Sequence, residues 1–117
     1  MEDKVTLDDL DELQARGEKL LIELRGKTAA IIFECTDLLL KLKAPGTVSP
    51  ERLRSMKANL HRRVTEGAMA FDEMIKAEEA GQVSLSGDRN AALKALLGDE
   101  VRLLERSTKE LVEEDGQ

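Results

Sequence analysis

Residues 43–50 read "KAPGTVSP", and this stretch decides how the chain folds. It holds both prolines of the sequence and separates two long segments with helical periodicity. Because the residue before a proline disfavours the helical conformation, the first helix must end before Pro45. Ser49 is a good N-cap residue and Pro50 suits the first helical position, so a second helix begins there. The sequence therefore predicts a helical hairpin that turns at this loop.

The segment before the loop has the pattern of one long helix over residues 6–43. Thr6 is a suitable N-cap, and the acidic first turn suits the positive end of the helix dipole. Seam positions then recur at alternating spacings of three and four, which is a heptad pattern. This apolar seam consists of Leu7, Leu10, Gln14, Gly17, Leu21, Leu24, Thr28, Ile31, Cys35, Leu38 and Leu42. The flanking residues Leu13, Leu20, Ile32 and Leu39 widen it. A seam this wide is expected to pack against two neighbours, in a rod roughly 55 Å long.

A second helix is predicted over residues 50–80, with Gly81 as its stop. It continues the seam with Leu53, Met56, Leu60, Val64, Gly67, Phe71 and Met74. A glycine inside a helix costs about 1 kcal/mol relative to alanine. We therefore expect Gly67 to let a neighbouring backbone approach closely, opposite Gly17 or Gly26.

A third helix is predicted over residues 88–114, with Ser86 or Asp88 as its cap. Its apolar positions are Leu93, Leu96, Leu97, Val101, Leu103, Leu104, Leu111 and Val112. Gly98 offers a point at which this helix can be interrupted. The predicted fold is all-α: one domain over residues 1–117, an elongated antiparallel hairpin plus a third helix, forming a three-helix bundle with coiled-coil-like seams.

Composition narrows the class of protein. Hydrophobic residues make up 41% and aromatic residues 2% of the 117 residues, which suits a helical bundle. The net charge of -6 argues against binding of the whole chain to nucleic acid or to an anionic membrane. One cysteine indicates a reducing compartment. The acidic N-terminus does not resemble a signal peptide, and "IIFECTDLLLKL" is too short to span a bilayer, so a soluble cytoplasmic protein is expected.

Charge is distributed in blocks along the predicted rod. Residues 1–12 are strongly acidic, whereas residues 41–63 are strongly basic. The hairpin gathers the second block into a basic tip, with Arg52, Arg54, Lys57, Arg62 and Arg63 as its candidate binding residues. Three interpretations are open: the tip is solvated or neutralised within one bundle, it docks an acidic partner, or it meets the acidic end of a second copy. Nucleic acid is the least favoured ligand, because no aromatic residues are interleaved for stacking.

His61 is the only histidine and the one candidate for chemistry on a helix. Histidine phosphotransfer domains carry a lone helical histidine, typically followed by a base and then a small residue. The stretch "HRRVTEG" departs from that order, since the two arginines come too early and Gly67 too late. His61 is therefore expected at the margin of the core, with phosphoacceptor as the alternative role.

No metal-ligand spacing, phosphate-binding loop or catalytic triad is present in the sequence, so we predict no enzyme activity, no metal and no cofactor. The predicted function is a helical protein–protein interaction module, such as an adaptor, assembly factor, small chaperone or subunit of a complex. A signalling bundle is the alternative. The third helix is expected to cover the seam incompletely, which predicts a homodimer or a helical heteromer. The seam residues assigned to the partner are Leu21, Leu24, Ile31, Leu38, Leu42, Leu60, Val64, Gly67 and Phe71.

Overall fold

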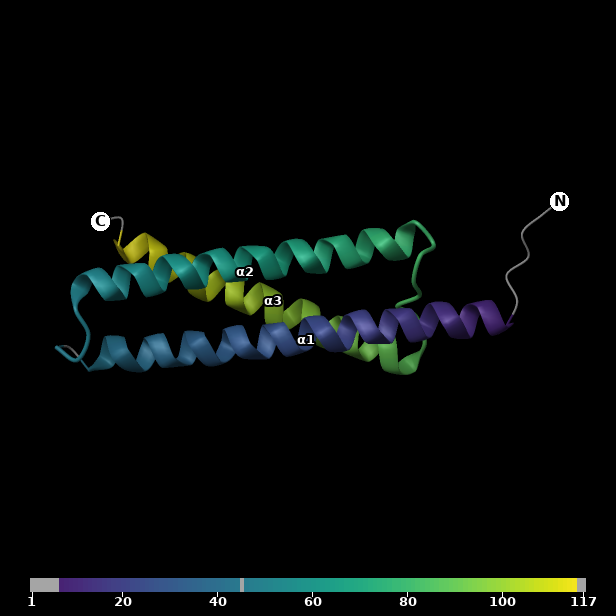
Figure 1. Cartoon of the computed structure of the whole chain (residues 1–117), viewed down its shortest axis with the longest axis horizontal. Coiled ribbons are helices and arrows are strands. Elements are labelled where there is room, and N and C mark those ends of the chain that lie inside the picture. The colour runs from purple at the N-terminus through teal and green to yellow at the C-terminus, as the bar shows by residue number, and fades with distance from the viewer. Residues whose placement is uncertain (1–6, 45, 116–117) are drawn as a thin grey trace.

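The computed structural model describes residues 7–44 and 46–115 of the chain. Three α-helices follow one another: α1 (Leu7–Lys43), α2 (Pro50–Glu79) and α3 (Asp88–Asp115) (Figure 1). α2 runs antiparallel to the other two helices, and the molecule measures 67 × 21 × 17 Å. The prediction of an elongated, all-α three-helix bundle is confirmed.

Local signals in the sequence produce the helix ends. Ser49 is the N-cap of α2, and its hydroxyl accepts the backbone N–H of Arg52 at 3.2 Å, while Pro50 takes the first helical position. At the other end Gly81 has a φ of +76°, the left-handed conformation in which glycine often ends a helix. These two boundaries are as predicted. Thr6 lies outside the described residues.

α3 begins at Asp88 and continues through Gly98 without interruption. The residue before it is Gly87, with a φ of +94°, and the carbonyl of Gly87 accepts the N–H of Ala91. Gly87 therefore occupies the N-cap position of α3, for which the sequence predicted Ser86 or Asp88. Gly98 is buried, and a Cβ placed on it would lie 3.3 Å from Cζ of Phe71. The glycine predicted to interrupt the helix instead lets the Phe71 ring of α2 pack against it.

The core forms two clusters along the bundle. One lies near the α2–α3 loop and contains Leu21, Leu24, Met74, Val83, Leu85, Leu97 and Val101. The other lies toward the α1–α2 loop and contains Ile31, Cys35, Leu38, Leu60, Val64, Leu104 and Leu111. All three helices contribute to both clusters, so each cluster joins α1, α2 and α3.

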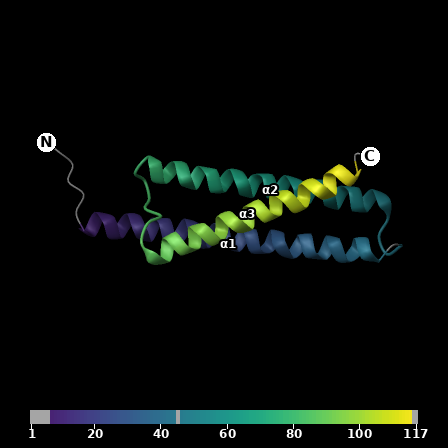
Figure 2. The same cartoon turned by 180° about the vertical axis from the view of Figure 1, so that it is seen from behind.

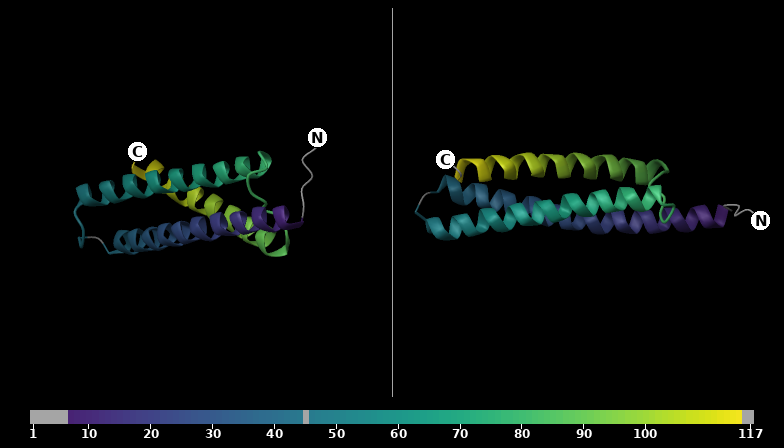
Figure 3. Two further views of the ribbon diagram at one scale, coloured as in Figure 1. Left: turned by 45° about the vertical axis from the view of Figure 1, so that its right-hand side comes forward. Right: turned by 90° about the horizontal axis from the view of Figure 1, so that it is seen from above.

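α3 crosses the hairpin obliquely. It lies on one face of the pair formed by α1 and α2 (Figure 3), and it passes from α1 at its start to α2 at its end (Figure 2). Ion pairs from Arg89 to Glu18 and from Glu100 to Arg25 join the first half of α3 to α1. The C-terminal half of α1 consequently has α3 farther from it than the N-terminal half does.

Candidate interaction surface

The residues predicted to bind a partner form the internal core instead. The fully buried ones are Leu21, Leu24, Ile31, Leu38, Leu60 and Val64. Leu42, Gly67 and Phe71 are half-buried. The seam is a packing pattern within the single chain, where α2 and an unbroken α3 cover most of it. Leu10, near its N-terminal end, is exposed. The first turns of α1 extend beyond α2 (Figure 1).

The close backbone contact occurs at Gly17 and not at Gly67. A Cβ on Gly67 would meet Cδ1 of Ile31 at 3.6 Å, an ordinary contact, so the predicted role of Gly67 is wrong. A Cβ on Gly17 would lie 2.1 Å from the carbonyl oxygen of Ser84. The α2–α3 loop therefore rests on the backbone of α1, and only glycine fits beneath it.

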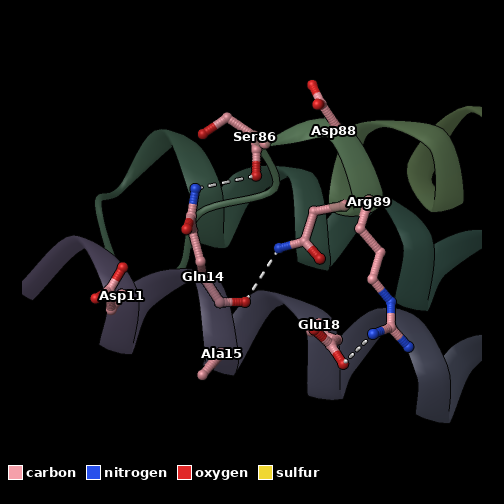
Figure 4. Close-up of a pocket in the computed structure, with 9 residues that line it drawn as sticks. Asp11, Gln14, Ala15, Glu18, Ser86, Asp88 and Arg89 are labelled. Atoms are coloured by element: carbon pink, nitrogen blue, oxygen red, sulfur yellow. Dashed lines mark hydrogen bonds and ion pairs between the residues drawn. The ribbon is translucent and has the colours of Figure 1, made fainter.

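Polar bonds hold this loop on α1 (Figure 4). The Ser84 N–H donates to the Leu13 carbonyl at 3.0 Å. The buried Asn90 amide donates to the carbonyls of Gln14 and Ser84 at 3.0 and 3.1 Å. These bonds satisfy backbone carbonyls of α1 and of the α2–α3 loop. The pocket drawn in Figure 4 lies where the start of α3 packs against α1, so we interpret it as part of this packing contact. Sequence reasoning placed Gly17 on the seam but gave no reason to pair it with the loop.

The predicted basic tip is divided by the structure. Arg52 and Arg54 are exposed in the first turns of α2, whereas Lys57 is buried. Arg62 lies farther along the helix and donates to Glu66 at 3.2 Å, and Arg63 is paired with Glu34 of α1. The five bases therefore do not form one anion-binding cluster.

His61 is exposed on α2. Its carbonyl accepts the hydroxyl of Thr65 at 2.9 Å. The neighbouring Arg62 also donates to the side-chain oxygen of Asn59 at 2.6 Å. The base nearest to the histidine in sequence is thus already engaged by residues of its own helix.

The side of α1 opposite the seam carries a second apolar pattern. Six positions spaced alternately by four and three form what we call the outer face: Ile22, Gly26, Ala29, Phe33, Thr36 and Leu40. All six are exposed, including Ile22 at 50%, Phe33 at 76% and Leu40 at 62%. None of the six is charged, so the outer face has the spacing of a packing surface without a neighbour.

Exposed apolar residues also flank the outer face. Leu39 of α1 is exposed, although the sequence placed it at the edge of the seam. Leu96 and Leu103, predicted as core, are exposed on the side of α3 that carries Glu100. Since Glu100 pairs with Arg25 at 3.8 Å, these leucines lie on the side of α3 next to α1. The apolar surface thus spans both helices.

Metal sites, membrane spans and the cysteine can be assessed for the described residues. No group of three potential ligands that could hold a metal occurs among the described residues. None of the helices in the described part of the chain has the length and hydropathy needed to cross a bilayer. Cys35 is buried in the core, and this burial raises the pKa of its thiol. No protein-family model matches the chain, and no curated protein or solved structure is significantly similar to it.

Proposed function

We propose that this protein is a non-catalytic helical interaction module whose binding surface is the outer face of α1. The observation that carries the proposal is Phe33, one of only two aromatic residues, which is 76% exposed at the middle of an uncharged helix face. Contiguous exposed apolar surface of this kind marks protein interaction sites in soluble proteins. An adaptor, an assembly factor, a small chaperone or a subunit of a complex fits this surface, and we place such a protein in the cytoplasm.

The spacing of the outer face indicates the kind of partner. Positions that alternate by four and three along a helix accept the side chains of another helix packed nearly parallel to it. Gly26 and Ala29 lie between the larger residues Ile22 and Phe33 and permit close approach of that helix. A partner helix with a matching apolar stripe is therefore the expected ligand.

Photo-crosslinking in the cell tests the proposal. A photoreactive amino acid replaces Phe33 in one variant and Met69 in a matched control. Met69 is also a large apolar residue, 62% exposed, on the outward side of α2. We expect discrete protein adducts at position 33 and none at position 69. Absence of adducts at position 33, or equal labelling at both positions, would contradict the proposal.

Phosphotransfer remains the second candidate because His61 is exposed on a helix, as a phosphoacceptor must be. Incubation with a phosphodonor, followed by mass measurement under alkaline conditions, tests it against His61→Gln. The interaction module predicts no change in mass for either protein. A stoichiometric mass increase that His61→Gln abolishes would establish phosphotransfer instead.

A further inference from the structure

We propose that the outer face of α1 binds the outer face of a second copy of this chain, with the two α1 helices antiparallel. The inference rests on the proposed function, since it names the partner of the same surface. It differs from the dimer expected from the sequence, because the apolar seam assigned to that interface is buried inside each chain.

The outer face is complementary to itself in one antiparallel register. A two-fold axis passing beside residue 31 sets Ile22 opposite Leu40 of the second copy, and Ala29 opposite Phe33. Gly26 then faces Thr36. Each of these pairs joins an a position of one helix to a d position of the other, as in antiparallel coiled coils. The largest side chain of the outer face, Phe33, then lies opposite the small Ala29.

Charges of both signs lie beside the outer face. Glu23, Lys27, Asp37 and Lys41 lie along the edge of α1 nearer α2, on which Glu34 pairs with Arg63 of α2. The two-fold axis sets Glu23 midway between the levels of Asp37 and Lys41 of the second copy, and Lys27 two residues from the level of Asp37. Within one chain Lys41 pairs with Asp37 at 2.7 Å, which leaves Asp37 partly neutralised where Glu23 of the second copy approaches it. This edge therefore does not select the register, and the orientation rests on the charge blocks at the two ends of the rod.

The charge blocks at the two ends of the rod disfavour a parallel arrangement of two copies. Parallel helices would set the acidic residues 8–12 of both copies side by side, and likewise the bases near the α1–α2 loop. The antiparallel arrangement directs each acidic end toward the basic loop end of the other copy. Repulsion between like blocks therefore acts against the parallel dimer at low ionic strength.

The flanking leucines are covered by the same arrangement. On the edge of α1 nearer α3, the two-fold axis places Leu39 of the second copy two residues from the level of Arg25. Arg25 pairs with Glu100, and Leu96 and Leu103 lie one turn on either side of that glutamate. The exposed leucines of both helices thus fall within one interface.

The size of this interface predicts a moderate affinity. Residues 22–40 span about 27 Å of helix, which is a short contact for a dimer. The dimer is therefore expected to dissociate on dilution.

Sedimentation equilibrium over a range of concentrations measures the dimer, using the full chain and the variants Phe33→Glu and Met69→Glu. Both replaced side chains are exposed, so both variants should keep the wild-type helicity and melting temperature at monomeric concentrations. We expect Phe33→Glu to raise the dissociation constant by at least ~30-fold, and Met69→Glu to leave it within about threefold of wild type. A monomeric wild type, or equal effects of the two variants, would overturn the inference.

Crosslinking determines the orientation. Ile22→Cys and Leu40→Cys chains with different tags are mixed and treated with a short bifunctional maleimide, while the buried Cys35 serves as the unreactive background in wild type. The antiparallel dimer gives the mixed product of positions 22 and 40. Products joining 22 to 22 and 40 to 40 would establish a parallel pair and overturn the inference. Adducts with a different protein at position 33 in the cell, together with a monomeric purified chain, would overturn the dimer and leave the interaction module intact.

Discussion

The inner face of α1, formed by the seam residues, and its outer face share the same heptad spacing, but the inner face is buried and the outer face is exposed. The inner face places Leu21 and Leu38 under α2 and α3, each 1% exposed, whereas the outer face leaves Ile22 and Leu40 in solvent. Both faces repeat apolar or small residues at alternating intervals of three and four. Periodicity therefore shows that a helix face is suited to packing, but the directions of the neighbouring helices decide which face is covered.

Truncation of adjacent residues on the two faces gives the largest expected difference. Leu21→Ala should lower the free energy of unfolding by about 2–5 kcal/mol, because it leaves a cavity in the core. Ile22→Ala, one residue away and half exposed, should change it by no more than about 0.5 kcal/mol. Chemical denaturation at monomeric concentrations measures both. A comparable loss for Ile22→Ala would show that the outer face is covered within a single chain.

Two glycines allow the same comparison at the backbone. Gly17→Ala should destabilise the fold by about 1–3 kcal/mol, because the new methyl group would displace the Ser84 carbonyl from α1. Gly26→Ala has nothing within 4 Å of its new Cβ and should stabilise the monomer by up to about 1 kcal/mol. Thermal melting of dilute protein records both shifts. A neutral Gly17→Ala would mean that the loop does not rest on this residue.

Gly67→Ala sharpens the comparison at the edge of the core. The added methyl group would make an ordinary contact with Ile31, so the gain in helix propensity should dominate. We expect the free energy of unfolding to rise by about 0.5–1 kcal/mol. Denaturant titration decides the sign, and a loss above about 1 kcal/mol would restore the close approach that the sequence suggested.

The last prediction concerns the rate of thiol alkylation at two adjacent positions, 35 on the inner face of α1 and 36 on its outer face. Burial raises the pKa of the Cys35 thiol, so little thiolate is present near neutral pH and alkylation of the native protein should be slow. A cysteine introduced by Thr36→Cys, at an exposed position, should be alkylated at least about tenfold faster. Mass spectrometry of labelled protein follows both thiols. Equal rates would show that the inner face opens readily to solvent.

The parts of the fold that local chemistry determines were predictable. Ser49 and Pro50 start α2 as expected, and the inner seam from Gly17 to Leu38 is buried as a unit, because caps and periodicity depend on residues close in sequence. The role of Gly17 was not predictable, since its neighbour Ser84 is remote in the chain. Gly98 was misinterpreted for the same reason, because the ring that packs on it comes from another helix.

The candidate site was missed although its signal was present. Ile22, Phe33 and Leu40 follow heptad spacing as regularly as the seam, but the seam is broader and more leucine-rich, so it was assigned to the partner as well as to the core. In a bundle of three helices, the widest apolar seam of α1 is used for the core. The second apolar face of the same helix then remains on the surface, where it can take part in association.

The bond between the Ser84 amide and the Leu13 carbonyl also has consequences for how the chain folds. It joins segments far apart in sequence, so it forms only after the α1–α2 hairpin has closed and the connection to α3 has been drawn back over α1. The docking of this loop is accordingly a late event in folding. The Ser84 amide, although it belongs to a loop, should exchange its hydrogen with solvent as slowly as amides in the middle of the helices, because its exposure requires the loop and the start of α3 to detach together.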